Sequence, residues 1–366
     1  MSRSSNPTVA LVQTAIGDYR ETFLDILADR LGGRLSIYAG SEYFDSSTKT
    51  QVRPEHRVRP LRNHFLLARR LLWQTGAVHA ALDVEVAVLE FNPRILSVWT
   101  TLVLRRVLSR PSLLWGHAWS RSGPHSASEP LRRLMRRLAG GVIVYTEADA
   151  RELAGSDPRT RTFVAPNALY RAADMQPTQP LSRPNSFIYV GRLVTPKKPD
   201  VLLQAFVYAS ESLPADTRLL FVGEGPMAAE LRERVVGSRL ASRVEFHGHV
   251  SDYETLRRLY AGAVASVSPG FVGLSITQSL GFGVPMIIAR DEPHSPEFVV
   301  AKAGWNAVVY APSTAATLAD TLIAVAQDRE TWIARRDEIS ADCRSRFSAE
   351  AMADGFIAAL EQVMLS

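Results

Sequence analysis

Residues 191–198 combine the side chain types that proteins use to hold phosphate groups. Gly191 is followed directly by Arg192, and the adjacent pair Lys197 and Lys198 comes shortly afterwards. Arginine offers a planar fork to phosphate oxygens, lysine adds a point charge, and glycine lets the backbone approach a ligand closely. Lysine is rare here, with 4 lysines among 42 basic residues, so the adjacent pair stands out. The segment predicts an anion site, and the alternative is two lysines that merely solvate a loop.

Three later segments also place glycine after an apolar run. They are LLFVGEGP (residues 219–226), VEFHGHV (residues 244–250) and SVSPGFVGLS (residues 266–275). In the last, the backbone N–H groups of Gly273, Leu274 and Ser275 open an expected helix and are suited to an anion. His247 and His249 share one strand face but have no third ligand beside them, so we expect no metal there.

The surrounding sequence alternates short apolar runs with amphipathic stretches, which is typical of βαβ units and a parallel sheet. In the first half we expect strands at residues 8–14, 35–39, 84–90, 112–115, 141–145 and 162–165. We expect helices at residues 20–29, 66–82, 95–108, 130–138 and 148–154.

The rhythm breaks in a proline-rich polar stretch and then starts again. In the second half we expect strands at residues 186–190, 218–222, 244–246, 263–268, 285–289 and 306–310. Helices are expected at residues 199–210, 227–236, 253–261 and 275–281, with a helical tail that ends in a helix over 351–365. The predicted organisation is a first domain over 1–170, a linker over 171–186, a second domain over 187–345 and a final helical segment over 346–366.

Composition narrows the class of protein. The chain has 366 residues, 46% apolar and 22% charged, which suits two soluble α/β domains. A single cysteine, Cys343, excludes an intrachain disulfide. No apolar run is long enough to span a bilayer, and no signal pattern opens the chain, so we expect a cytoplasmic protein.

Here the sequence resembles a known family. The segments VGRL, VGEGP, VEFHGHV and SPG…GLS…QSL.FGVP stand in the order and spacing of the GT4 nucleotide-sugar glycosyltransferases. The resemblance is specific over residues 187–310 and looser before about residue 140. It implies the GT-B fold, in which two Rossmann-like doubly wound domains face a cleft and the last helix crosses back to the first domain.

The resemblance also implies an activity and its site. It implies retaining, metal-independent transfer of a sugar from a UDP- or GDP-linked donor to a glycan or lipid-linked acceptor, with no cofactor, in surface polysaccharide or glycolipid assembly. Arg192 and Lys198 match the pair that holds the donor diphosphate, with Lys197 as the substitute, and His117 matches the active-site histidine. The donor-binding residues would be Gly191, Lys197, Gly223, Glu224, His249, Gly270, Gly273, Leu274, Ser275 and Gln278.

One departure concerns two positions where the family commonly carries glutamates. This chain has Gly270 and Gln278 there. The amide of Gln278 still hydrogen-bonds ribose hydroxyls, without charge, whereas Gly270 has no side chain to touch a sugar. The departure keeps two alternatives open, namely a catalytically weak nucleotide-binding partner subunit of GT-B fold and another GT-B enzyme such as a nucleotide-sugar epimerase.

Three residues of the first half are candidates for acceptor binding. Gly17 and Arg20 follow the first expected strand, and Glu90 closes another at the same edge of the sheet. Gly17 would allow close approach, Arg20 would contact acceptor or phosphate, and Glu90 would orient an acceptor hydroxyl. The alternative for Arg20 is a solvated helix start, and for His117 it is an ordinary turn histidine.

Basic residues concentrate in the first half. Residues 1–180 hold 24 basic and 16 acidic side chains, and residues 181–366 hold 18 and 21. Arginine-rich helices are expected around residues 66–72 and 131–138. They predict peripheral contact with an anionic membrane that carries a lipid-linked acceptor. The alternative is solvation in an arginine-biased chain, while no motif indicates nucleic-acid binding.

Overall fold

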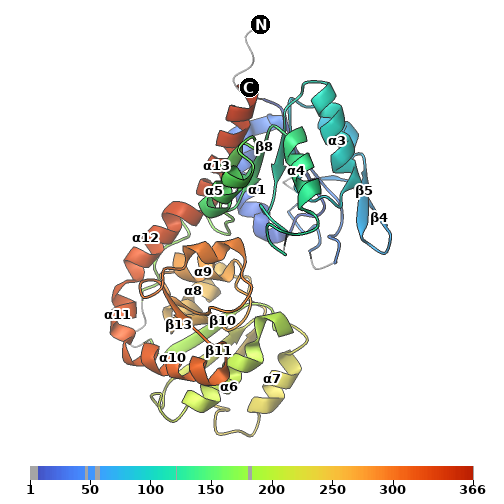
Figure 1. The fold of residues 1–366 in the computed structure, drawn as a ribbon. Coiled ribbons are helices and arrows are strands. Elements are labelled where there is room, and N and C mark those ends of the chain that lie inside the picture. Colours follow the sequence, from blue (N-terminus) through green and yellow to red (C-terminus); the bar gives the residue numbers. More distant parts are fainter. Residues whose placement is uncertain (1–6, 46–47, 54–57, 121, 180–183, 366) are drawn as a thin grey trace. The chain divides into compact units, whose positions relative to one another are not determined.

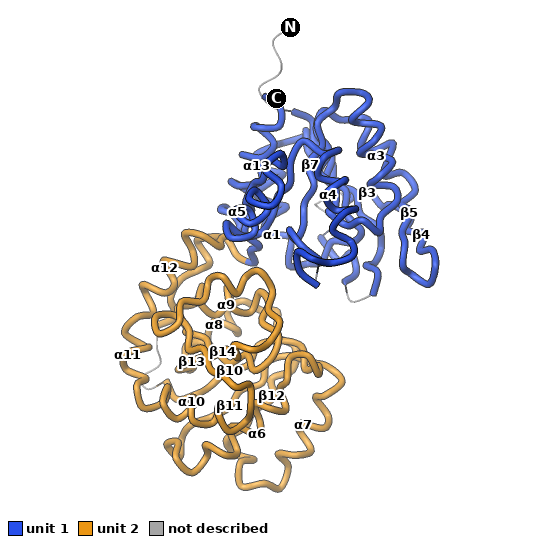
Figure 2. Tube along the Cα trace, viewed as in Figure 1, with its two compact units in different colours: residues 1–169, 349–366 blue, residues 170–348 orange. Residues whose placement is uncertain are grey.

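The computed structural model describes residues 7–45, 48–53, 58–120, 122–179 and 184–365. The chain forms two compact units (Figure 2). Unit 1 comprises residues 1–169 and 349–366, and unit 2 comprises residues 170–348. Each unit is built on a parallel sheet with helices packed against it (Figure 1), so the predicted α/β class is confirmed.

The sheet of unit 1 has the strand order β3-β2-β1-β6-β7-β8-β9. Its strands are β1 (Val9–Gln13), β2 (Leu35–Ala39), β3 (Arg59–Pro60), β6 (Val86–Glu90), β7 (Ser112–Trp115), β8 (Gly141–Val144) and β9 (Thr162–Val164). The helices are α1 (Glu21–Leu31), α2 (Ala77–Leu82), α3 (Leu96–Val107), α4 (Glu129–Leu138), α5 (Glu147–Ser156) and α13 (Ala349–Met364), with short 3-10 turns η1 (Asp18–Arg20) and η2 (Gly32–Arg34).

Both faces of this sheet are buried, which explains its nearly continuous apolar strands. In β1, Val9 and Leu11 join a core with α1 and α13, while Ala10 and Val12 face the opposite core. The C-terminal helix α13 lies close to β9, where a Cβ on Gly355 would stand 1.9 Å from the carbonyl oxygen of Val164. The last helix therefore completes the core of unit 1.

The expected helix over 66–82 is wrong for its first half. Residues 62–75 form an antiparallel hairpin of β4 (Arg62–Leu66) and β5 (Leu71–Thr75), and only α2 follows as a helix. The turn places Leu67, Ala68 and Arg69 at φ values of 49°, 50° and 64°. Such left-handed conformations break a helix, and distant contacts stabilise them here.

Those distant contacts come from one side chain at the hairpin tip. The guanidinium of Arg69 donates to the carbonyls of Phe44 and Tyr43, each at 2.7 Å, and to the Glu42 carboxylate at 2.8 Å. None of these partners is close in sequence to Arg69. The local pattern of leucine and arginine, which carries no information on such contacts, therefore predicted a helix.

Unit 2 has the strand order β12-β11-β10-β13-β14-β15, with every pairing parallel. Its strands are β10 (Ser186–Val190), β11 (Arg218–Val222), β12 (Val244–Gly248), β13 (Ala263–Ser268), β14 (Met286–Ala289) and β15 (Ala307–Tyr310). The helices are α6 (Pro199–Ala209), α7 (Ala228–Val235), α8 (Tyr253–Ala261), α9 (Ser275–Gly281), α10 (Ala315–Gln327), α11 (Arg329–Ala334) and α12 (Arg336–Phe347), with 3-10 turns η4 (Thr195–Lys197) and η5 (Pro296–Val300).

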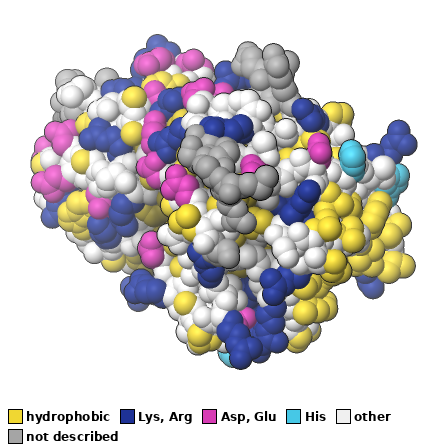
Figure 3. All heavy atoms as spheres, turned by 90° about the horizontal axis from the view of Figure 1, so that it is seen from above, with side chains coloured by type: hydrophobic (Ala, Val, Ile, Leu, Met, Phe, Trp, Pro, Cys, Tyr) yellow, Lys and Arg dark blue, Asp and Glu magenta, His cyan; other side chains and the backbone are white. Residues whose placement is uncertain are grey.

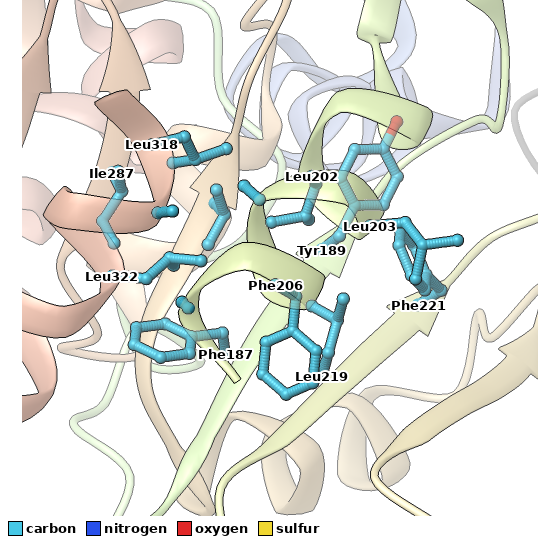
Figure 4. Close-up of a cluster of buried hydrophobic side chains, with 14 of the residues drawn as sticks. Phe187, Tyr189, Leu202, Leu203, Phe206, Leu219, Phe221, Ile287, Leu318 and Leu322 are labelled. Carbon is cyan, nitrogen blue, oxygen red and sulfur yellow. The ribbon is translucent and has the colours of Figure 1, made fainter. Parts of the chain in front are cut away.

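The largest core of unit 2 lies between the sheet and helices α6 and α10. Phe187, Phe206 and Leu219 come from β10, α6 and β11 and are fully buried side by side (Figure 4). Leu318 and Leu322 of α10 close the same core. This packing fixes the start of α6, and therefore the loop that carries the adjacent lysines.

The stretch expected to be a linker packs on unit 2. Met175 is buried among residues of α9 and α12. The backbone N–H of Thr178 donates to the carbonyl of Phe282 at 2.9 Å. Residues 180–183 lie outside the described part of the chain. The remainder behaves as part of unit 2 because it carries a buried apolar side chain and fixed backbone bonds.

Candidate functional site

The strand order of unit 2 reverses between β10 and β13. In open α/β sheets, ligands bind beyond the carboxyl ends of the strands at such a switch point. The loop after β10 spans residues 191–198, and the loop after β13 spans residues 269–274. The two loops touch, because the N–H of Phe271 donates to the carbonyl of Pro196 at 2.9 Å. The phosphate-type residues predicted from the sequence lie on these two loops.

Glycines allow the backbones to meet at this edge. A Cβ on Gly223 would lie 1.9 Å from the carbonyl oxygen of Gly191, and a Cβ on Gly270 would lie 2.5 Å from that of Pro196. The N–H of Gly223 donates to the carbonyl of Gly248 at 2.7 Å. Backbone groups therefore replace side chains at the ends of β10, β11 and β12.

Lys197 and Arg192 place two positive charges at the switch point. Burial, and then the charge of Arg192, lower the pKa of Lys197 to about 8, against the opposing influence of Glu297. The ammonium lies 5.2 Å from the ring centre of Phe271 and 3.8 Å from the position of a Cβ on Gly273. A half-buried cation beside a second cation favours a bound anion, which would relieve both costs.

Lys198 differs from its neighbour in conformation and partner. It adopts a left-handed conformation, with φ of 51°, at the start of α6. Its ammonium pairs with the carboxylate of Glu292, a residue in the loop after β14. The structure therefore separates the two lysines, with the charge of Lys198 already matched inside unit 2.

The other predicted donor residues divide into two groups. Gly273, Leu274 and Ser275 form the turn into α9, which has no side-chain cap. Glu224 accepts a hydrogen bond from Arg232 at 3.0 Å, and the exposed His249 follows β12. The first group adjoins Lys197, whereas the second lies at the ends of β11 and β12.

Gln278 is placed differently from the other donor candidates. Its amide nitrogen donates to the Tyr170 hydroxyl at 2.6 Å, and its amide oxygen accepts from the Tyr260 hydroxyl at 3.2 Å. The side chain is buried, and both ends of the amide are engaged. The geometry gives Gln278 a role in holding α9 against α8 and the start of unit 2.

Unit 1 has its own switch point between β1 and β6, where Glu90 lies. The N–H of Thr14 donates to the Glu90 carboxylate at 2.8 Å. Burial raises the pKa of the Glu90 carboxyl, while hydrogen bonds to the carboxylate, first of all from Thr14, lower it. Burial, and then the charge of Glu90, raises the pKa of the Tyr43 hydroxyl. This edge therefore holds a carboxyl group with a shifted pKa, which is a common feature of functional sites.

Arg20 belongs to an aromatic cluster on the same edge. Its guanidinium lies 4.6 Å from the ring centre of Trp115, and it donates to the Tyr145 hydroxyl at 3.4 Å. The ring centre of His117 lies 5.1 Å from that of Tyr145. Gly17 lies under the ring of Tyr19, with a hypothetical Cβ 2.6 Å from it. Arg20 and His117 are thus brought together, and Arg20 is not a simple solvated helix start.

Sequence reasoning missed several residues of these two edges. Glu292 and His294 lie in the loop after β14, where His294 accepts from the N–H of Val272 at 3.2 Å. Trp115 and Tyr145 hold Arg20. A usable signal existed for both pairs, since each lies at or just beyond the carboxyl end of an expected strand.

Two negative findings concern the described residues as a whole. Within the described residues, no group of three or more His, Cys, Asp or Glu side chains is placed to hold a metal ion. Over that same part of the chain, no helix combines the length and hydrophobicity needed to cross a membrane.

Comparison with solved structures identifies the fold. Anabaena Alr3699/HepE, solved in complex with UDP, superposes with a TM-score of 0.71 over 97% of this chain and 99% of its own, at 16% identity. The sucrose-phosphate synthase of Thermosynechococcus elongatus gives a TM-score of 0.65 over 98% and 99%, at 19% identity. The chain has the GT-B glycosyltransferase fold, which confirms the fold expected from the sequence.

Sequence comparison adds the family of one region. Residues 171–342, nearly all of unit 2, match the family Glycosyl transferases group 1. A GDP-mannose-dependent alpha-(1-6)-phosphatidylinositol dimannoside mannosyltransferase of Mycobacterium tuberculosis is 30% identical over 106 residues. That alignment spans 28% of this chain and 26% of the relative. Together, the family match and the GT-B fold support the classification of this chain as a glycosyltransferase.

Proposed function

We propose that the protein is a GT4-like transferase that moves a sugar from a nucleoside diphosphate sugar to a hydroxyl acceptor with retention of configuration. The observation that carries this proposal is the half-buried Lys197 beside Arg192 at the switch point between β10 and β13. The bound UDP of the HepE structure and the GDP-mannose dependence of the mycobacterial relative support a nucleotide-sugar donor.

The chemistry needs charge stabilisation at the leaving group. The acceptor oxygen forms a bond to the anomeric carbon while the bond from that carbon to the β-phosphate oxygen breaks. The electron pair stays on the phosphate oxygen, which also receives the acceptor proton. Arg192 and Lys197 would stabilise the growing negative charge, as a metal ion does in other transferases, so the proposal requires no cofactor.

The first half of the chain supplies the candidates for the acceptor. We propose that Gly17, Arg20 and Glu90 bind a glycan or lipid-linked acceptor, because they lie at the switch-point edge of the unit 1 sheet, and that His117 is the active-site histidine. A role in surface polysaccharide or glycolipid assembly is proposed from the resemblance to the GT4 family alone.

The proposal is tested first by nucleotide binding and turnover. UDP, GDP and dTDP are each added in a thermal-shift assay, since a ligand that binds the folded state raises the melting temperature with its occupancy. The sugar conjugates of the stabilising nucleotide are then assayed for slow hydrolysis without acceptor. Stabilisation with turnover supports the enzyme. Stabilisation without turnover across sugars and lipid acceptors would favour the nucleotide-binding partner subunit.

UDP binding should depend on pH through Lys197. Lys197 is charged below its pKa of about 8 and neutral above it, so UDP affinity should fall about tenfold at most between pH 7 and pH 9. The terminal phosphate of the nucleotide is largely ionised throughout this range, because the second pKa of a phosphate group is about 6. Lys197→Arg should keep the affinity high across the range. Titration calorimetry of Lys198→Gln is the matched control, and a pH response lost in that variant instead would assign the role to Lys198.

A further inference from the structure

Exposed large apolar side chains gather on one part of unit 1. Eight of them lie on the hairpin tip, α3 and α4, namely Leu66, Leu67, Val103, Leu104, Val107, Leu108, Leu131 and Leu134. These elements are neighbours, because α3 packs against both β5 and α4. The space-filling view shows a broad hydrophobic region at its right, the side on which Figure 1 places α3 and the hairpin (Figure 3). Apolar side chains gathered in this way indicate an interaction surface.

The charges around this surface have one sign. Five exposed arginines lie on the hairpin tip, on α3 and α4 or directly after α3, namely Arg70, Arg106, Arg110, Arg133 and Arg137. Residues 62–75, 96–110 and 130–138 contain no Asp or Glu. The adjoining Glu129 is buried and pairs with Arg136 at 2.6 Å. The surface therefore presents uncompensated positive charge between apolar side chains.

The hairpin tip is held in place rather than left to its local preferences. Arg69 ties it to the segment of Tyr43 and Phe44, and the Arg94 side chain donates to the carbonyl of Arg70 at 2.8 Å. Leu67 remains 70% exposed at this tip. A left-handed turn with an outward leucine costs free energy, and such strain is found most often where a segment has a role.

We infer that this surface docks on an anionic lipid bilayer. Leucine and valine side chains enter the boundary between headgroups and acyl chains, and the arginines contact the lipid phosphates. A depression of about 510 Å³ beside α4 has Arg133, Arg137 and Leu134 in its wall, together with Glu129, whose carboxylate pairs with Arg136. The two arginines suit a phosphate headgroup, and Leu134 suits its first acyl carbons. Docking on a bilayer fixes where the protein binds and does not depend on the proposed reaction.

A second copy of this chain fits the surface less well. Symmetric dimers place the same patch of each subunit against the other. Arginines would then face arginines, with no carboxylate on the three segments to pair with them. A bilayer rich in anionic headgroups supplies the missing charge.

The test is cosedimentation of the full chain with lipid vesicles. Vesicles of phosphatidylcholine alone are compared with vesicles that also contain phosphatidylglycerol, and binding is expected with the second kind and to weaken with salt. Arg106→Gln and Arg133→Gln should each lower the partition coefficient about fivefold. The matched control is Arg234→Gln, an exposed arginine of α7 in unit 2.

The apolar contribution is tested with another matched pair. Val107 on α3 is 76% exposed, and Val236 after α7 is 78% exposed. Val107→Ser should lower vesicle binding severalfold, while Val236→Ser should leave it unchanged, with both melting temperatures preserved. Equal binding to both kinds of vesicle, no binding to either, or equal effects of the two serine variants would overturn the inference. So would a dimer in solution that Val107→Ser dissociates, because the surface would then be covered by a second copy.

Discussion

Replacing Arg192 with alanine should weaken UDP binding by about 30- to 100-fold. The estimate rests on charge-assisted hydrogen bonds to phosphate, which contribute about 1.5–3 kcal/mol each, and on about 1.4 kcal/mol for each tenfold in affinity. The backbone of Arg192 is fixed, since its carbonyl accepts from the Tyr189 hydroxyl at 2.8 Å and the next residue, Leu193, is buried. The loss would therefore come from the guanidinium and not from a rearranged loop.

The measurement is titration calorimetry with UDP and with GDP. The side chain of Arg192 is exposed, so the melting temperature without nucleotide should match that of the unsubstituted protein. Arg192→Lys should recover part of the affinity, because it keeps the charge and loses the fork. Arg234→Ala serves as the surface control. Unchanged nucleotide affinity in Arg192→Ala would contradict the role of Arg192 at the donor diphosphate.

Much of the fold could be predicted because its strands are buried on both faces. Continuous apolar runs such as those of β1 and β10 give a clear signal, and the glycines that follow them mark the ligand edge of the sheet. The hairpin of β4 and β5 could not be predicted in the same way. Its turn depends on Arg69 bonding to Tyr43 and Phe44, and local sequence carries no information on such distant contacts.

The sequence predicted which residues the candidate site contains better than it predicted how their side chains are paired. Residue types placed Arg192 and the two lysines together, but they could not say which ammonium would be matched by a carboxylate. That depends on Glu292, which reaches Lys198 from a loop 94 residues away. Gln278 shows the same limit, because its amide is engaged by Tyr170 and Tyr260, which come from distant segments.

Replacing Gly270 with alanine should damage both folding and nucleotide binding. The new Cβ would lie 2.5 Å from the carbonyl oxygen of Pro196 and 2.8 Å from the carbonyl carbon of Lys197. Both are backbone atoms, so the loop that carries Lys197 must move. Overpacking of this kind costs about 1–3 kcal/mol of stability. Displacing Lys197 should cost more than tenfold in UDP affinity as well, since the cation would leave the turn at Gly273.

The same contact explains why this chain has glycine and not glutamate at position 270. Gly270→Glu would meet the same backbone atoms, so restoring the family's carboxylate should impair UDP binding instead of improving it. Gly155→Ala is the control, because a Cβ there meets nothing within 4 Å. The measurements are denaturation and UDP titration of the three variants. A Gly270→Glu protein that binds UDP as tightly as the unsubstituted chain would contradict the predicted loss of affinity.

A carboxylate is still present in this part of unit 2, because Glu292 pairs with Lys198 from the loop after β14. Gly270 therefore leaves room for the loop that carries Lys197 and Lys198. Glu292 balances the charge of Lys198 on that loop.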